Sequence, residues 1–171
     1  MGQTEEYSTA LIRRFEQFYD ESEHFVPAAA YAISKEKYDL LGPIVDASHR
    51  GAVNLLRNQI EETAWLPLWA RGMENDLQLE PLSVGSSHST ELQEHSGTTR
   101  QSQRIRALAA SAFGAGFGGS CWALVHRHQA QEFAKQWRQA YDERFPPKDI
   151  NGGSLMREFF LVEPGPGAFR T

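Results

Sequence analysis

The sequence is poor in cysteine and has no concentrated positive charge. Cys121 is the only cysteine among the 171 residues, which excludes an internal disulfide. Because Cys121 stands in an apolar run, it is expected to pack as a small hydrophobic side chain. The basic residues are dispersed and the formal net charge is -5, which disfavours nucleic acids and anionic membranes as partners.

Long hydrophobic runs are also missing. No apolar stretch approaches the roughly 20 residues that a membrane-spanning helix requires. The first residues do not follow the pattern of a secretory signal, and Glu6 stands where N-myristoylation needs Ser or Thr. The sequence therefore predicts a cytoplasmic protein with enough apolar side chains, 40% of the total, for a packed core.

A first helix is predicted between Thr9 and Ile33, where apolar residues recur at helical spacing. Pro27 predicts a kink or a break, because it has no N–H to donate to the carbonyl of Glu23. The side chains expected to face water are Arg13, Arg14, Glu16, Gln17, Asp20 and Glu21. Those expected to face the core are Leu11, Phe15, Phe18, Phe25, Val26, Ala29 and Ile33.

Two more helices and a polar segment follow. The second helix is predicted from Glu36 to Arg57, with an early interruption at Gly42-Pro43. The third has Thr63 as its N-cap and stops at Gly72. Residues 74–106 are rich in Ser, Thr and Gln and show no steady apolar period. That composition predicts a disordered surface insertion, since little apolar area can offset the entropy of ordering it.

The next feature is a cluster of four glycines within six residues, directly before an apolar run. They are Gly114, Gly116, Gly118 and Gly119. Such a cluster at the mouth of a strand marks backbone that passes where side chains do not fit. Its N–H groups suit an anion such as a phosphoryl oxygen, while the alternative is a plain tight turn between two strands.

The remaining pattern predicts strands on both sides of the glycines and a helix near the end. An Ala-rich stretch after Ile105 leads into the glycines, and Cys121 to Val125 form a short buried strand. A helix is expected from Gln129 to Phe145, and a last strand from Leu155 to Val162. We therefore predict one α+β domain over residues 1–171, with a small, mostly antiparallel sheet and helices on one side.

Several segments of the chain have a familiar pattern, beginning with Phe113-Gly-Ala-Gly-Phe-Gly-Gly-Ser-Cys-Trp-Ala-Leu-Val125. This segment resembles the third conserved motif of the GHMP small-molecule kinases, most closely of their galactokinase-like branch. Tyr38-Asp-Leu-Leu-Gly-Pro-Ile-Val-Asp-Ala-Ser-His49 resembles a second family segment, and Pro164-Gly-Pro-Gly-Ala168 a familiar tail. Two departures leave the sugar open. Phe113 replaces the usual Thr before the first glycine, and Asn58-Gln59 replace a usual Asp-Tyr.

The resemblance implies ATP-dependent phosphorylation of a monosaccharide, with a sugar 1-phosphate as product. It places the loop of Gly114, Ala115, Gly116, Phe117, Gly118 and Gly119 beside substrate and nucleotide. The family's serine-rich ATP loop and sugar signature have no counterpart here, so the chain resembles the C-terminal half. ATP and Mg²⁺ are implied for the complete enzyme, with an N-terminal half in cis or in trans. Neither is expected to bind tightly to this chain, and no catalytic residue or metal ligand is assigned.

Other interpretations stay open. The chain could instead be a non-catalytic binding or regulatory module derived from such a kinase, or a truncated gene product. A homo-oligomer is a further possible state of the chain. Ser48-His49 and Arg57 are weaker candidates for the cleft, against ordinary solvated or capping roles. His126 and His128 share a strand face but have no visible third metal ligand. The sequence Val84-Gly-Ser-Ser-His-Ser89 imitates a serine loop, but no strand is predicted before it and no helix after it.

Overall fold

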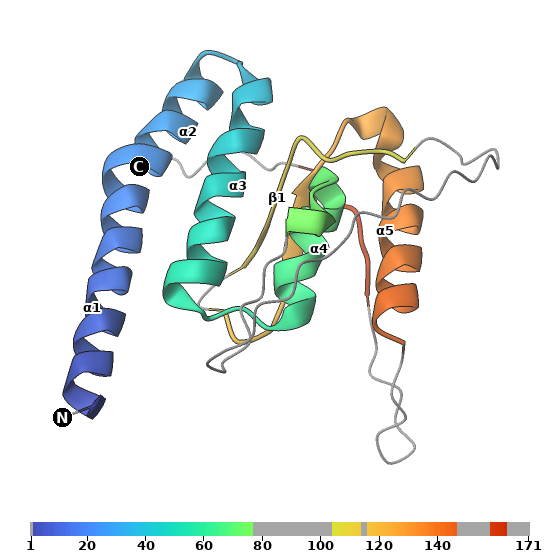
Figure 1. Cartoon of the computed structure of the whole chain (residues 1–171). Coiled ribbons are helices and arrows are strands. Elements are labelled where there is room, and N and C mark those ends of the chain that lie inside the picture. The colour runs from blue at the N-terminus through green and yellow to red at the C-terminus, as the bar shows by residue number, and fades with distance from the viewer. Residues whose placement is uncertain (1, 77–103, 114–115, 147–157, 164–171) are drawn as a thin grey trace, which may run out of the picture.

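The structure is a computed structural model that describes residues 2–76, 104–113, 116–146 and 158–163. In these ranges it has five α-helices and two strands, joined in part by short 3-10 and π-helical turns (Figure 1). The elements are α1 (Gly2–Asp20), α2 (Val26–Ser34), α3 (Leu41–Gly51), α4 (Glu61–Arg71), β1 (Ala109–Ala112), β2 (Cys121–Leu124) and α5 (Ala130–Arg144).

The two strands form an antiparallel pair that is covered on both faces. Ala109 pairs with Leu124 and Ala112 with Cys121. Since successive side chains alternate between the faces, Ala109 packs with α2 and α3. Ala110 packs with α4 and α5 on the other face. The α+β class is confirmed, but the prediction of helices on one side is wrong. Two covered faces also explain why β2 reads as an unbroken apolar run.

The predicted third strand is not formed in the part of it that the structure describes. Residues 155–157 lie outside the described ranges, and Glu158–Glu163 carry no strand. Phe159 instead packs edge-on against Trp137, with ring centroids 5.5 Å apart, and also contacts Tyr141. Of the described apolar residues that suggested a strand, Phe159 packs on α5, whereas Phe160, Leu161 and Val162 are exposed.

The larger core cluster lies between α4, α5 and β1. Trp65, Leu66, Ala110, Phe133 and Trp137 are buried there. The indole N–H of Trp137 donates a 3.0 Å hydrogen bond to the carbonyl of Leu66. This bond satisfies the single polar atom of a large buried side chain. Helix α5 therefore packs on α4 without the free-energy cost of burying an unpaired N–H group.

Helix α4 begins earlier than predicted and ends where predicted. Ile60 is the N-cap, and the hydroxyl of Thr63 donates back to the Ile60 carbonyl at 3.3 Å. Thr63 is therefore an interior residue and not the cap. Pro67 lies inside the helix and leaves the Thr63 carbonyl without its usual donor. The thiol of Cys121 approaches that carbonyl at 3.9 Å. Gly72, with φ of 76°, ends the helix as predicted.

The first helical stretch is continuous but passes through a π-helical turn at Glu21–Phe25. The Val26 N–H reaches back five residues to the Glu21 carbonyl. Pro27 follows at the start of α2, where a missing N–H is tolerated. The predicted irregularity at Pro27 therefore takes the form of a widened turn just ahead of it.

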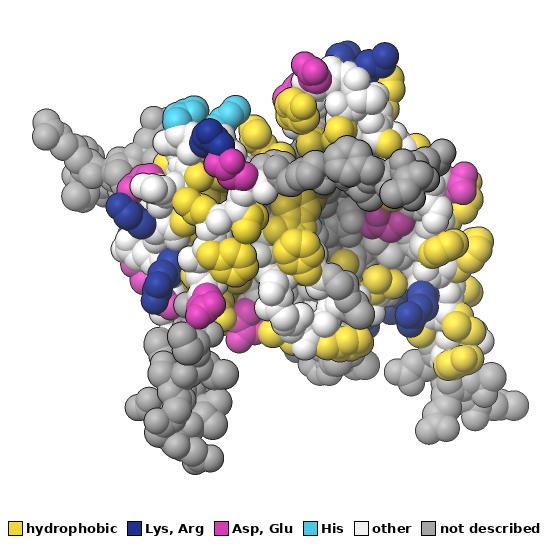
Figure 2. Space-filling view, turned by 180° about the vertical axis from the view of Figure 1, so that it is seen from behind, with side chains coloured by type: hydrophobic (Ala, Val, Ile, Leu, Met, Phe, Trp, Pro, Cys, Tyr) yellow, Lys and Arg dark blue, Asp and Glu magenta, His cyan; other side chains and the backbone are white. Residues whose placement is uncertain are grey.

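Helix α1 does not bury its apolar stripe. Gln17 is 5% exposed, whereas Leu11, Phe15 and Phe18 are 50%, 66% and 69% exposed. Val26 and Ile33, farther along the same predicted helix, are also exposed. The prediction that the stripe faces the core and Gln17 faces water is therefore wrong. Figure 2 shows hydrophobic side chains gathered along the edge of the molecule that α1 forms.

The predicted helix at Glu36–Arg57 is divided into three parts. A 3-10 turn at Tyr38–Leu40 leads into α3, and a π-helical turn at Ala52–Leu56 follows it. Gly42 and Pro43 lie in the first turn of α3 and do not interrupt it. Arg57 then leaves the helical path with φ of 51°.

The ends of the predicted insertion at 74–106 lie close together. Glu74–Asp76 form a 3-10 turn. The Arg104 guanidinium pairs with the Glu74 carboxylate and lies 4.0 Å from the ring centroid of Trp69. Residues 77–103 lie outside the described ranges. Where the structure describes the chain, none of its helices combines the length and the apolar character that crossing a bilayer demands.

Candidate functional site

The glycine turn follows β1 and has an unusual backbone. Gly114 and Ala115 lie outside the described residues. Gly116, Phe117, Gly118 and Gly119 all have positive φ, at 87°, 61°, 113° and 103°. Residues other than glycine rarely adopt such angles, so three glycines out of four residues are what this conformation needs. Phe117 adopts the left-handed conformation without that freedom.

One side of the turn is fixed to the loop before α4. The Phe117 N–H donates to the carbonyl of Asn58. A Cβ at Gly116 would lie 2.1 Å from that same carbonyl oxygen. Gly116 is therefore required for close approach to Asn58 as well as for its φ. The N–H of Phe117 is used within the protein, so it is not available to an anion.

The other side of the turn is open. A Cβ at Gly118 would meet nothing closer than the Ile60 side chain, at 3.6 Å, and one at Gly119 would meet nothing within 4 Å. The Phe117 side chain is 80% exposed. Among the described residues, the N–H groups of Gly118 and Gly119 have no hydrogen-bond partner. The turn thus offers bare backbone at the surface of this chain.

A cavity of about 360 Å³ lies next to the turn, between α1, α3 and β1. Asn58, which anchors the turn, lines it, as does Ala112 at the end of β1. Apolar walls come from Phe18, Ala52 and Leu56. The polar side chains that line it are Arg14, Gln17, Glu21, Ser48, His49, Asn58, Gln59 and Ser111.

Polar side chains of α1 and of the π-helical turn that follows it line this cavity beside Phe18. The Gln17 side-chain N–H donates to the Glu21 carboxylate at 2.8 Å, and the Ser48 hydroxyl donates to the same carboxylate oxygen. The Gln17 amide oxygen lies where a Cβ of Gly51 would be, 1.8 Å from that position. Because Gly51 has no side chain, the Gln17 amide can pack against the end of α3. The oxygens Oε1 of Gln17 and of Gln59 are buried and have no hydrogen-bond partner among the described residues.

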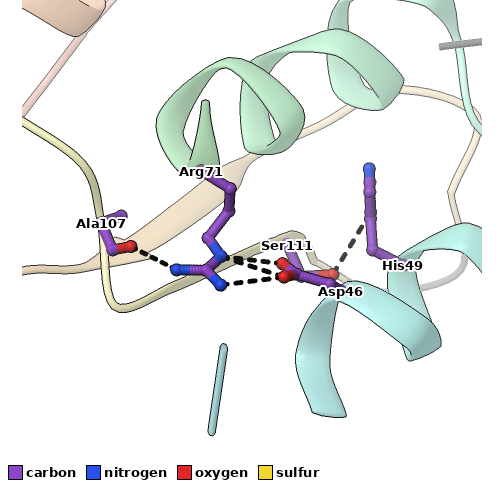
Figure 3. A network of polar contacts seen from close by, with 5 residues as sticks. All are labelled: Asp46, His49, Arg71, Ala107 and Ser111. Atoms are coloured by element: carbon purple, nitrogen blue, oxygen red, sulfur yellow. Dashed lines mark hydrogen bonds and ion pairs between the residues drawn. The ribbon is translucent and has the colours of Figure 1, made fainter. Parts of the chain in front are cut away.

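His49 lines the cavity and is 2% exposed. Figure 3 shows its contact with Ser111. Its Nε2 lies 3.1 Å from the Ala64 carbonyl, and its Nδ1 lies 3.4 Å from the Ser111 hydroxyl. A carbonyl only accepts, so Nε2 carries the proton and Nδ1 accepts from Ser111. Burial lowers the pKa of His49 from its ordinary value of 6.5, which favours the neutral ring.

An ion pair beside His49 holds together α3, α4 and the segment that precedes β1 (Figure 3). Arg71 donates from Nε and Nη2 to the Asp46 carboxylate, at 2.9 Å each, and from Nη1 to the Ala107 carbonyl at 2.6 Å. A Cβ at Gly42 would lie 2.4 Å from Arg71 Nη2, so a glycine is needed for the guanidinium to fit. The bidentate pair leaves few guanidinium donors free, which indicates a structural role.

The other sequence candidates lie elsewhere. Arg57 is exposed and does not line the cavity. The rings of His126 and His128 stack at 5.6 Å on the surface. In the ranges that can be described, no group of three or more His, Cys, Asp or Glu is placed to hold a metal ion. Burial raises the pKa of the Cys121 thiol to about 12, so the thiol is unreactive at neutral pH. Val84–Ser89 lie outside the described residues.

Sequence reasoning named Ser48 and His49 but missed Gln17 and Glu21. Arg14, Gln17 and Glu21 follow one another at spacings of three and four residues, which places them on one side of a helix. That spacing was the available signal. It was hidden by the apolar stripe on the adjoining side, which suggested that the polar residues face water.

Comparison of the chain with protein-family models, curated protein sequences and solved structures returned no match.

Proposed function

We propose that the chain is the C-terminal half of a galactokinase-like GHMP kinase, and that it contributes to ATP-dependent phosphorylation of a monosaccharide. The observation that carries the proposal is the open glycine turn beside a polar cavity. Its four consecutive positive φ angles expose backbone, and the turn is hydrogen-bonded to Asn58, which lines that cavity. A turn buried by the protein's own helices could not contact a ligand and would have contradicted the proposal.

The role of the turn follows from the chemistry of phosphoryl transfer, which depends on positioning and on charge stabilisation. Gly118 and Gly119 present N–H groups without partners among the described residues, and no side chain there blocks a ligand. They are suited to approach a phosphoryl oxygen or a sugar closely. The turn itself has no base and no metal ligand, so it shapes the cleft and does not catalyse.

The nucleotide and the metal belong to the companion half in this proposal. The described residues offer no cluster of ligands for Mg²⁺, and none is assigned to it. An N-terminal half, in cis or in trans, would supply the ATP loop and the acid–base residue. This chain closes the sugar side of the cleft.

The test replaces Gly118 by Val in an enzyme reconstituted with an N-terminal half that carries the serine-rich loop. With φ of 113°, Val at this position strains the backbone and also occupies the open side of the turn. We expect sugar phosphorylation to fall about 100-fold, the scale of losing one transition-state contact. Unfolding free energy should fall by only about 1–3 kcal/mol, the cost of the strained residue.

Gly72→Ala is the matched control. Gly72 also has positive φ, at 76°, but it ends α4 and contacts Arg106. It should lose stability to a similar degree and keep its turnover per folded molecule. Equal effects of the two substitutions on turnover would establish the glycine cluster as an ordinary bend and overturn the proposal.

A second candidate is a non-catalytic module that docks on another protein. The exposed apolar side chains on α1, with Phe15 and Phe18 about two thirds exposed, favour it. An in-frame serine-loop sequence upstream in the gene would support the kinase, and a stable complex in which no sugar is phosphorylated would support the module.

A further inference from the structure

We propose that one side of α1 is a self-association surface, on which a second copy of the chain packs its own α1 with the two helices running in the same direction. The surface consists of the exposed apolar side chains of α1, called the α1 stripe from here on: Tyr7, Leu11, Ile12, Phe15, Phe18 and Tyr19. The inference is independent of the proposed kinase function, because it is argued from the exposure, spacing and charge of α1 alone.

Helix α1 is attached to the rest of the molecule by one side. In the described chain, its main contacts are with α3 and with the π-helical turns at residues 21–25 and 52–56. Figure 1 shows α1 at one edge of the molecule, and Figure 2 shows hydrophobic side chains gathered along that edge. The side opposite the buried Gln17 is therefore accessible to another protein surface.

The exposed apolar area of the α1 stripe is large enough for a specific interface. Its four aromatic side chains are between 49% and 69% exposed. Because an aromatic side chain buries about 150–250 Å² when it is fully covered, these four leave roughly 400–600 Å² uncovered in each copy. Leu11 and Ile12 are at least half exposed and add to this area. Two copies together thus offer on the order of 1,000–1,500 Å², which reaches the range of specific protein interfaces.

The spacing of the stripe suits a pair of helices. Leu11, Phe15 and Phe18 follow one another at intervals of four and three residues, which is the alternation of the contact positions in a two-helix coiled coil. Ile12 and Tyr19 extend the same surface at one side of this row. A twofold-symmetric pair places the same ridge of side chains from each copy against the other, so one helix supplies both halves of the interface.

Two charged residues lie at opposite margins of the stripe. Arg14, Phe15 and Glu16 are consecutive, and successive residues of an α-helix are about 100° apart around its axis. Arg14 and Glu16 therefore lie on either side of Phe15. Both are exposed, and among the described residues neither takes part in an ion pair.

These charges favour a second copy and one direction of packing. When two copies of α1 run in the same direction around a twofold axis, opposite margins meet, and Arg14 of each copy faces Glu16 of the other. When the two helices run in opposite directions, like margins meet, which brings Arg14 to Arg14 and Glu16 to Glu16. The stripe is therefore self-complementary in the parallel arrangement, and like charges at its margins disfavour the antiparallel one.

The first test is sedimentation equilibrium of the 171-residue chain over a wide range of concentrations. We expect a monomer–dimer equilibrium with a dissociation constant of about 1–100 µM, since the area is at the lower end for specific complexes. Phe15→Ser should raise this constant about tenfold or more, because Phe15 lies at the centre of the stripe. Phe160→Ser is the matched control. Phe160 is also highly exposed but lies outside α1, so its loss should leave the constant unchanged.

The second test exchanges the marginal charges. Arg14→Glu and Glu16→Arg should each raise the dissociation constant about three- to tenfold, because each substitution replaces two symmetry-related attractions by repulsions. The double variant should recover most of the loss. Both residues are exposed, so all three variants should fold, which circular dichroism checks.

The third test reports the direction of the helices. A parallel pair brings the two copies of residue 8 together, whereas an antiparallel pair centred on Phe15 holds them about 20 Å apart. Mild oxidation should therefore produce a disulfide-linked dimer of Ser8→Cys. The wild type, whose Cys121 lies outside the stripe, should give none, and Ser8→Cys combined with Phe15→Ser should give much less.

Several results would overturn the inference: a chain that stays monomeric at all concentrations, equal effects of Phe15→Ser and Phe160→Ser, no recovery in the double charge variant, or no cross-linking of Ser8→Cys. A monomer that uses Phe15 to bind a separate protein would also overturn it, since the surface would then belong to that partner. None of these measurements involves sugar phosphorylation, so failure of the kinase proposal leaves this inference standing and the reverse also holds.

Discussion

Helices α4 and α1 both carry several large apolar residues, yet the protein uses them in opposite ways. Helix α4 buries Thr63, Ala64, Trp65, Leu66, Pro67, Leu68 and Ala70. Of the described side chains of α1, Gln17 is buried, while the aromatic side chains Phe15, Phe18 and Tyr19 are 49% exposed or more. Apolar burial stabilises α4 in its place, whereas the polar contacts of Gln17 and Glu21 orient α1.

The side chains that stabilise the fold and the side chains that are free to contact a ligand or a partner therefore lie on different helices. Residues that pack on α4 are committed to the core and cannot change without a cost in free energy. Residues on α1 leave apolar area uncovered and polar acceptors unsatisfied, which is typical of surfaces that meet a ligand or a partner. The comparison therefore predicts a steep gradient in the effect of substitutions, from the core cluster around α4 outward to α1.

The largest effect is expected at the contact between α5 and α4. Trp137→Ala removes a buried indole and leaves the Leu66 carbonyl without its donor. We expect the free energy of unfolding to fall by about 3–5 kcal/mol. Urea denaturation followed by circular dichroism measures it. A loss below about 1 kcal/mol would show that α4 and α5 do not form the stability centre.

The ion pair between α3 and α4 is expected to rank next. Arg71→Met leaves the Asp46 carboxylate buried and unpaired, since the Asp46 side chain is 7% exposed. The loss should be about 3 kcal/mol, and the double variant Asp46→Leu with Arg71→Met should recover much of it, because no buried charge remains. Thermal unfolding of the three variants tests this, and equal instability of single and double variants would contradict it.

A smaller, pH-dependent effect is expected at His49, which contacts α4 and lines the cavity beside α1. Its folded pKa is lowered, mainly by burial, so the unfolded chain binds more protons than the folded chain below about pH 6.5. Stability should then fall as the pH drops below that value, with a slope of at most about 1.4 kcal/mol per pH unit from this group. Denaturation at pH 7.5 and 5.5 should show this difference in the wild type and less of it in His49→Asn. An identical pH dependence in both would place the effect elsewhere.

The smallest effect is expected on α1 itself. Phe15→Ser removes a side chain that is 66% exposed, so the unfolding free energy should change by no more than about 0.5 kcal/mol. The exposed apolar area should fall at the same time. Sedimentation at increasing concentration would show weaker self-association if copies of the chain associate through α1. A loss comparable to that of Trp137→Ala would remove the contrast between the two helices.

Much of the local structure could be predicted from the sequence. The Cys121 strand, the helix before Phe145 and the end of α4 at Gly72 follow from short patterns of apolar residues, glycine and proline. The glycine turn was also predicted, because clustered glycines indicate a backbone path that leaves no room for side chains. The site was predicted only in part. Gln17 and Glu21 were not predicted as site residues, because periodicity shows which residues share a face of a helix but not whether that face points to the core or to water.

The sequence by itself determined where α4 ends, where the glycine turn lies and most of the segments that become helix or strand, since those depend on φ preferences and on spacing along the chain. It did not determine the fate of residues 158–162, which were predicted to be strand and are not. Only the tertiary structure decided that both faces of the sheet are covered and that Asn58 holds the glycine turn. It also decided that α1 turns Gln17 inward and Phe15 outward. Those outcomes depend on which distant surfaces meet, and a helix packs with its polar side inward where the contacts offered there are polar.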